Sequence, residues 1–231
     1  MTGLRADSYP PSPRPSPTKR GRGSKDDIVV LSGLAESAAA ELLREIERVA
    51  AVAPFRNMVV PGGHSMSVAM TNCGRLGWVT DRSGYRYTER DPLSGRAWAA
   101  MPRAFGELAT RAAAEAGFGE FAPDACLVNR YEPGARMGLH QDRNEADFGQ
   151  PIVSVSLGLP ATFLWGGAKR RDPVRRLPLR HGDVVVWGGA ARLRFHGVAP
   201  LGRQAPTFGG TPGMHPATGG FRFNLTFRRA G

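Results

Sequence analysis

The sequence FRFNLTFR, from Phe221 to Arg228, alternates strictly between apolar and polar side chains. A period of two is typical of a β-strand, because successive side chains point to opposite faces of a sheet. The apolar face must be buried against something, and the polar face meets either solvent, which is the default, or a polar cavity. A cavity would have to supply anionic partners to Arg222 and Arg228, since unpaired buried charge is too costly.

The rest of the chain suggests that this strand belongs to a mainly β domain with flanking helices (α+β). Short β-type segments, separated by Gly, Pro, Asn and Asp, fall at residues 126–131, 137–139, 152–159, 162–165, 174–178, 183–187, 194–198 and 221–228. Their regular spacing is typical of a sandwich or barrel. Upstream we predict a strand at 28–31, helices at 36–50 and 102–116, and hairpin-like strands over 58–87. Together these elements predict a jelly roll with helices packed on one sheet.

The charge of the chain favours a polyanionic partner. Its 231 residues carry a formal net charge of +11, and six basic residues against one acidic residue fall in the first 25. Residues 1–25 are rich in Pro and Ser and predict a disordered basic tail, which leaves 26–231 as a single domain. A basic domain suggests nucleic acid, and the plain alternative is a basic proteome background.

The cysteines and the hydropathy predict the compartment. Cys73 and Cys126 form no Cys-x-x-Cys pair, so a cysteine zinc site is not expected, and a reducing cytoplasm fits two isolated cysteines. We see no secretory signal and no apolar run long enough to cross a membrane. We therefore expect a cytoplasmic protein without a membrane partner.

A metal site is suggested by His140-Gln141-Asp142, which follows a strand-like segment. In an extended chain, residues two apart point to the same face, so both side chains can bind one ion. Two imidazoles and one carboxylate on one face favour non-haem Fe(II), with positions left open for oxygen chemistry. The third ligand is His196 in a strand-like stretch or, as its serious competitor, His215. The alternative interpretation of His196 is a hydrogen-bonded core histidine, and His64 and His181 fit turn contexts better.

The metal site and the arginine-rich strand fit one small co-substrate. Arginine binds a carboxylate through two parallel N–H donors, in a planar geometry that lysine lacks. A dicarboxylate could bind a metal ion at one end and arginine at the other.

The order of these residues resembles the AlkB family of 2-oxoglutarate-dependent nucleic-acid demethylases. The resemblance covers roughly residues 27–229 and extends beyond the ligands to MSVAMTN at 66–72, PDACLVNRY at 123–131, IVSVSLG at 152–158 and HGDVVVWGG at 181–189. It implies a double-stranded β-helix, or jelly roll, with an N-terminal nucleotide-recognition lid at about 58–90. It implies Fe(II), 2-oxoglutarate and O2 as cofactor and co-substrates.

The resemblance also implies roles for individual residues. Iron would be bound by His140, Asp142 and His196. Arg222 would hold the distal carboxylate of 2-oxoglutarate and Arg228 would lie near its metal-proximal carboxylate and Asp142. The other co-substrate contacts would come from Asn129, Tyr131 and, on the same polar face, Asn224.

For the substrate, the resemblance implies that Trp78 stacks on the damaged base, with His140 on the other face; a lid-core role is the alternative for Trp78. Tyr85 would contact a phosphate, Arg170 would contact the substrate, and Leu127 would line the pocket. Two departures from the bacterial pattern bear on specificity. Asn144 stands where an acid is expected near the base edge, and residues 201–219 form a longer connection.

The expected activity is oxidative demethylation of 1-methyladenine- and 3-methylcytosine-type bases in alkylated DNA, single- or double-stranded, and by extension in RNA. It would release formaldehyde, succinate and CO2 and so reverse alkylation damage directly. An oxygenase acting on a protein or small molecule is the first alternative, and a non-enzymatic nucleic-acid-binding protein is the second. We expect a monomer.

Overall fold

Strands dominate residues 27–202 and 218–231, which are the part of the chain that the computed structural model describes. The predicted tail at 1–25, most of the predicted connection at 201–219, and His215 lie outside the described residues. No helix in the described ranges is long and apolar enough to cross a membrane.

The larger sheet has seven strands in the order β1-β11-β8-β13-β6-β3-β2. The strand predicted from FRFNLTFR is β13 (Arg222–Arg228), and it lies in the middle of this sheet, antiparallel to both neighbours. The other members are β1 (Val29–Leu31), β2 (Arg56–Val59), β3 (Ser65–Gly74), β6 (Ala125–Tyr131), β8 (Ile152–Gly158) and β11 (Val184–Trp187).

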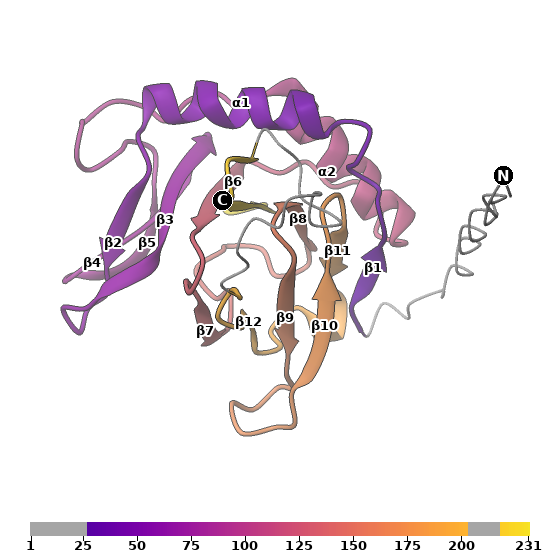
Figure 1. Cartoon of the computed structure of the whole chain (residues 1–231). Helices are drawn as coiled ribbons and strands as arrows, with labels where there is room; N and C mark the ends of the chain where they lie inside the picture. Colours follow the sequence, from indigo (N-terminus) through magenta and orange to yellow (C-terminus); the bar gives the residue numbers. More distant parts are fainter. Residues whose placement is uncertain (1–26, 203–217) are drawn as a thin grey trace, which may run out of the picture.

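The smaller sheet has four strands in the order β10-β9-β12-β7 (Figure 1). They are β7 (Met137–His140), β9 (Ala161–Trp165), β10 (Arg175–Leu179) and β12 (His196–Val198), and a 3-10 turn, η1 (Gly189–Ala191), precedes β12. Buried side chains of both sheets meet in one apolar cluster, for example Tyr131 and Trp187 with Phe163 and Trp165. The two facing antiparallel sheets confirm the predicted jelly roll.

Two helices, α1 (Ala39–Val52) and α2 (Arg103–Glu115), cover the outer face of the larger sheet (Figure 1). Leu42, Ile46 and Phe105 from the helices pack with Leu225 and Phe227 of β13 in a second apolar cluster. Helical spacing of the apolar residues produces this contact, because it places them on one stripe of each helix. The apolar face of β13 is therefore buried under the helices, as its alternation required.

The predicted start of the first helix, at residue 36, is wrong by three residues. The backbone N–H of Ala35 donates to Gly182 O at 2.9 Å, and that of Gly33 to Asp183 Oδ1 at 3.0 Å. A Cβ on Gly182, whose φ is +84°, would lie only 2.4 Å from Cγ of Glu36. The segment before α1 is thus held against the turn that precedes β11, and helical geometry begins only after it.

The region predicted as a lid holds a two-stranded hairpin of β4 (Gly77–Asp81) and β5 (Gly84–Thr88) beside β2 and β3. Asn72 of β3 fixes this hairpin to the larger sheet: its Oδ1 accepts from the backbone N–H of Trp78 and its Nδ2 donates to Trp78 O, each at 3.0 Å. We call residues 58–90 the lid.

Candidate metal and co-substrate site

Strand pairing brings two histidines together. In the pairing of β7 with β12, His140 and His196 are direct cross-strand partners, and their ring centroids lie 4.4 Å apart. A Cβ on Gly197 would lie 2.6 Å from Met137 O, so glycine allows the close approach of these strands. Asp142 follows two residues after His140, and the potential ligand atoms of the three side chains lie within 4.8 Å of one another. The structure therefore gathers the three residues that the sequence analysis singled out.

The hydrogen bonds of the two rings leave matching nitrogens for a metal. Nδ1 of His140 lies 2.9 Å from Gly138 O, and Nδ1 of His196 lies 3.1 Å from Arg194 O. A carbonyl oxygen only accepts, so Nδ1 must carry the hydrogen in both rings. Both Nε2 atoms lie toward Asp142, at 3.5 and 3.7 Å from its carboxylate oxygens, and each offers a lone pair to a metal ion when its ring is neutral.

Arg228 fixes the carboxylate of Asp142. Its Nε and Nη2 donate to Oδ2 at 2.9 and 2.7 Å, which leaves Oδ1 for a metal ion. Burial would raise the pKa of Asp142, but the charge of Arg228 and a hydrogen bond from His140 outweigh it and hold that pKa well below its usual range. Asp142 is therefore ionised, which is the form that binds a metal ion.

The two histidines differ in their acidity. Burial and the nearby His140 lower the pKa of His196 to about 3, so its ring is neutral. Burial also acts to lower the pKa of His140, but a hydrogen bond and the charge of Asp142 outweigh it and raise that pKa. His140 is the more accessible ring, with 39% of its side chain exposed against 5% for His196.

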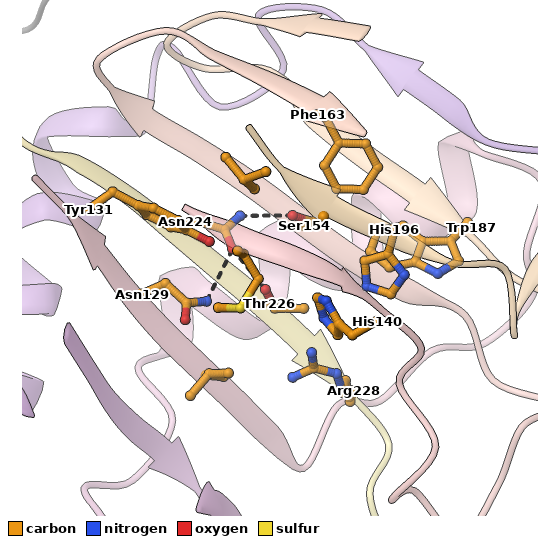
Figure 2. A pocket seen from close by; sticks show the side chains of 14 residues that line it. Asn129, Tyr131, His140, Ser154, Phe163, Trp187, His196, Asn224, Thr226 and Arg228 are labelled. Atoms are coloured by element: carbon orange, nitrogen blue, oxygen red, sulfur yellow. Dashed lines mark hydrogen bonds between the residues drawn. The ribbon is translucent and has the colours of Figure 1, made fainter. Parts of the chain in front are cut away.

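One pocket connects this cluster to the polar face of β13 (Figure 2). Several predicted site residues line it: Leu127, Asn129, Tyr131, His140, His196, Asn224 and Arg228. Asn224, Thr226 and Arg228 of β13 thus face a cavity, and all four polar side chains of this strand are buried, with exposures of 1% to 6%. Solvent, the default for an alternating strand, is wrong here, because β13 lies in the middle of the sheet between the helices and the smaller sheet.

Arg222 is buried at the other end of β13, without an anion. Its Nη2 donates to Ser156 Oγ at 3.0 Å, and its guanidinium carbon lies 5.0 Å from the centroid of the Tyr131 ring. Its Nε and Nη1 are buried and have no hydrogen-bond partner among the described residues. Burial lowers the pKa of Arg222 from its usual value. Two open donors on a buried cation fit a carboxylate ligand.

Asn224 is already saturated with hydrogen bonds. Its Nδ2 donates to Ser154 Oγ at 2.8 Å and to Val155 O at 3.0 Å, and its Oδ1 accepts from Asn129 and from Thr226. The amide nitrogen of Asn129 carries a second hydrogen that can reach a ligand. Asn224 thus orders this polar face, whereas Asn129 and Tyr131 retain donors for a co-substrate.

Comparison with known proteins identifies the family. Residues 27–228 match the family described as the 2OG-Fe(II) oxygenase superfamily. The alpha-ketoglutarate-dependent dioxygenase AlkB of Escherichia coli (strain K12) is 56% identical over 203 residues, which is 88% of this chain and 90% of that protein. The chain belongs to the AlkB group of the 2OG-Fe(II) oxygenases.

More distant relatives agree with this assignment. The protein named DNA N(6)-methyladenine demethylase ALKBH1C of Arabidopsis thaliana is 34% identical over 175 residues, which is 67% of this chain and 38% of that protein. The solved structure of OsALKBH1 superposes with a TM-score of 0.72 at 26% identity, over 87% of this chain and 97% of that one. The predicted family, fold and cofactors, Fe(II), 2-oxoglutarate and O2, are confirmed.

The predicted substrate residues of this oxygenase lie around the metal cluster rather than in the pocket wall, except Leu127. The indole Nε1 of Trp78 donates to Asn144 Oδ1 at 3.3 Å, two residues beyond Asp142. Tyr85, 48% exposed, stacks on Trp78 with ring centroids 5.8 Å apart. On the other side, Nη1 of Arg170 donates to Leu139 O at 2.8 Å, beside His140.

Sequence reasoning missed a buried ionic network in this AlkB-type enzyme. Glu145, whose side chain is 2% exposed, accepts a hydrogen bond from the Tyr87 hydroxyl at 2.7 Å, and its Oε1 lies 3.3 Å from Nε of Arg228. Its Oε2 accepts from Arg192 at 3.1 Å, and Arg192 also donates to Asp142 O at 3.0 Å. The segment after β7 thus links the lid to the metal cluster. No periodicity marks Glu145 in the sequence.

Two other histidines, His181 and His64, lie outside the metal cluster, as their sequence contexts predicted. Nδ1 of His181 accepts from the backbone N–H of Gly158 at 2.9 Å, which is the structural role in a turn that its context suggested. His64 is exposed and lies outside the metal cluster.

Proposed function

We propose that this oxygenase removes N-methyl groups from alkylated nucleobases, with 1-methyladenine- and 3-methylcytosine-type lesions in DNA as its main substrates and RNA as a further one. The observation that carries the proposal is the arrangement of three features around β13 and the pocket beside it. Three metal-binding groups lie beside an aromatic pair on the lid, and a buried arginine with two open donors lies at the far end of β13. The Arabidopsis relative, which is named a DNA demethylase, supports the same substrate class.

The residues of the site fit both Fe(II) and 2-oxoglutarate. His140, Asp142 and His196 would hold Fe(II) through two imidazoles and one carboxylate, the donor set that suits this ion. Arg222 would bind the distal carboxylate of 2-oxoglutarate, which satisfies its open Nε and Nη1. When bound, these groups and O2 supply the oxidation that turns an N-methyl group into N-hydroxymethyl, which leaves as formaldehyde, with succinate and CO2 as the other products.

The protein supplies position and electrostatics. Arg228 holds Asp142 ionised and in one orientation through two hydrogen bonds to a single oxygen. The hydrogen bonds from the two Nδ1 atoms keep Nε2 of each histidine free for the metal. Asn129 and Tyr131 would donate to the co-substrate, and the apolar pocket wall, which includes Leu127 and Phe163, excludes water from it.

The lid would receive the damaged base. Trp78 offers a ring to stack on a base, which supplies affinity without sequence choice. A base inside a duplex must be flipped out to reach the metal cluster, and flipping costs the free energy of unpairing it. That cost is lower for a methylated base whose pairing is already lost. The contact between Trp78 and Asn144 occurs within two residues of Asp142. Asn144 can both donate and accept, so it would contact the edge of either base.

Turnover of defined oligonucleotides tests the proposal. The protein, Fe(II), ascorbate and 2-oxoglutarate are incubated with single-stranded DNA that carries 1-methyladenine or 3-methylcytosine, and methyl loss is followed by mass spectrometry. We expect loss of 14 Da per lesion, roughly matched by succinate, and no turnover by His196→Ala, which loses a metal ligand. Succinate without methyl loss would instead favour a protein or small-molecule substrate.

A second variant tests the stacking role. Trp78→Ala should raise the KM for the oligonucleotide, because base stacking contributes about 1–3 kcal/mol. Iron binding should be unchanged, since Trp78 is not part of the metal cluster. If Trp78→Ala turns over the oligonucleotide as the unaltered protein does, Trp78 is a lid-core residue instead.

We further propose that the enzyme works in the cytoplasm as a monomer. Its two cysteines are free and buried, which suits a reducing compartment. Sedimentation of the purified chain should give a mass near 24.8 kDa, and a mass of twice that value would contradict the monomer.

A further inference from the structure

Positive charge is concentrated on one hairpin of this oxygenase. Residues 169–180, which cover part of the connection from β9 to β10 and the whole of β10, hold six basic side chains and one acidic one. All the other described residues together hold 18 basic and 17 acidic side chains, so they are close to neutral. The six basic side chains are all exposed. We call them the basic arm: Lys169, Arg170, Arg171, Arg175, Arg176 and Arg180.

The basic arm begins at the metal cluster. Arg170 donates to Leu139 O, one residue before His140. Across the smaller sheet, Arg175 pairs with Trp165, Trp165 with His196, and His196 with His140. The arm therefore runs from the strand that carries His140 to the opposite edge of the sheet, where Figure 1 shows β10 and the long loop between β9 and β10.

Part of the arm has no counter-charge among the described residues. Asp27 accepts a hydrogen bond from Arg175 at 2.7 Å. The one acid of the segment, Asp172, accepts from the backbone N–H of Lys169 at 2.9 Å. Arg171 and Arg176 form no ion pair with any described residue. Exposed arginines in such number repel one another, so an external polyanion would stabilise them.

The width of the sheet indicates which polyanion fits. Neighbouring strands lie about 4.8 Å apart, so the three steps from β7 to β10 span about 14 Å. The two phosphate backbones of B-DNA face each other across the major groove, whose width of about 12 Å is close to this span. A strand whose flipped base lies at His140 would have its partner strand at about the distance of β10.

We infer that the basic arm, beyond Arg170, binds the phosphate backbone of the undamaged strand when the substrate is duplex DNA. This inference rests on the proposed function, because that function places the damaged strand at the metal cluster. A plainer role for exposed arginines exists: charged side chains on an edge strand such as β10 prevent pairing with another sheet. The two roles predict different results with single-stranded and duplex ligands.

The test uses Arg171→Ser/Arg176→Ser in the full-length protein. Its matched control is Arg44→Ser/Arg103→Ser, which removes the same charge from α1 and α2, on the far side of the larger sheet. Binding of a methylated duplex and of its methylated strand alone is measured by fluorescence anisotropy over a range of salt concentrations. Turnover of a methylated trinucleotide is measured in parallel.

For the arm variant we expect the duplex Kd to rise about ten-fold and the slope of log K against log salt to become shallower by about 2, since two phosphate contacts are lost. The Kd for the single strand should change less than about two-fold, as should both Kd values of the control variant. Trinucleotide turnover should be unchanged.

Two results would overturn the inference. An equal loss for single strand and duplex would assign the arm to phosphates of the damaged strand. No loss for either, with increased aggregation of the variant, would leave only the edge-strand role. Failure of the proposed function is a separate result, because the unaltered protein would then fail to turn over the trinucleotide whatever its duplex affinity.

Discussion

Arg222 and Arg228 lie six residues apart on the same face of β13, and their side chains are buried to a similar extent, but their surroundings differ. Arg228 contacts two carboxylates: Asp142, through hydrogen bonds of 2.9 and 2.7 Å, and Glu145, at 3.3 Å. Arg222 contacts a serine hydroxyl and the face of a tyrosine ring, and two of its donors have no partner in the part of the chain that the structure describes. Burial lowers the pKa of Arg222, whereas the partners of Arg228 outweigh burial and raise its pKa.

This difference separates two uses of a buried cation. A guanidinium that is paired with carboxylates of the protein is stabilised by the fold and holds a candidate metal ligand in place before any ligand binds. A guanidinium with open donors destabilises the empty protein and is stabilised only when an anion binds. The surroundings of Arg228 are therefore organised by the fold, whereas those of Arg222 are left open to an anionic ligand.

The largest effect should come from Arg228→Ala. It leaves Asp142 and Glu145 buried without their shared cation, and breaking a buried ion pair in this way costs about 3–5 kcal/mol. Urea unfolding of the metal-free protein measures the loss. Arg228→Lys is the control, since it keeps the charge but not the paired donors, and should lose less. A loss below about 1 kcal/mol for Arg228→Ala would contradict the structural role.

Arg222→Met should show the opposite pattern. Methionine removes a buried, partly unsatisfied charge, so the unfolding free energy of the metal-free protein should be unchanged or higher. The affinity for 2-oxoglutarate should fall about 100-fold, which corresponds to about 3 kcal/mol for a two-donor contact to a carboxylate. Isothermal titration of the Fe(II) protein without O2 gives both Kd values. Unchanged affinity would remove Arg222 from the co-substrate site.

The sequence predicts that Arg222 and Arg228 lie on the same face of a strand, but it does not predict that their surroundings differ. Alternation along β13 places both on one face, and it cannot distinguish solvent from a cavity. That choice depends on the sheet order, because β13 has β6 and β8 on its two sides, helices on one face and the smaller sheet on the other. Order in a sheet arises from contacts between residues far apart in the chain, which no local pattern records.

Part of the metal cluster could be predicted from the sequence, because His140 and Asp142 are two residues apart. His196 needed the family resemblance, and the structure places it directly opposite His140. The role of Glu145 could not be predicted from the sequence. It lies in an irregular segment, and its partners Tyr87, Arg192 and Arg228 are 58, 47 and 83 residues away. A buried carboxylate whose partners are all distant gives no signal in a single sequence.

Asp142→Asn should have a smaller effect, on the pH dependence of the unfolding free energy. Its pKa is lower in the folded protein than in the unfolded chain, where it is about 3.9. The ionised carboxylate therefore stabilises the fold above pH about 4, and this stabilisation is lost as the pH falls toward the folded pKa. Unfolding of the metal-free protein should depend less on pH below about 4 in Asp142→Asn. Equal pH dependence would mean that Arg228 does not depress this pKa.

Tyr87→Phe should have the smallest effect on the unfolding free energy. This variant tests whether the ionic network around Arg228 also stabilises the lid. The hydroxyl of Tyr87 donates to Glu145 at 2.7 Å, so the ionic network around Arg228 includes a residue of β5. Loss of one hydrogen bond to a carboxylate should lower the unfolding free energy by about 1.5 kcal/mol, at the low end for such bonds because Glu145 keeps its two arginines. Tyr85→Phe is the matched control, because Tyr85 is 48% exposed and loss of its hydroxyl should leave stability unchanged. Hydrogen exchange should also become faster in β4 and β5 of Tyr87→Phe alone. If both variants are as stable as the unaltered protein, the lid is held by Asn72 and Trp78 and not by the ionic network.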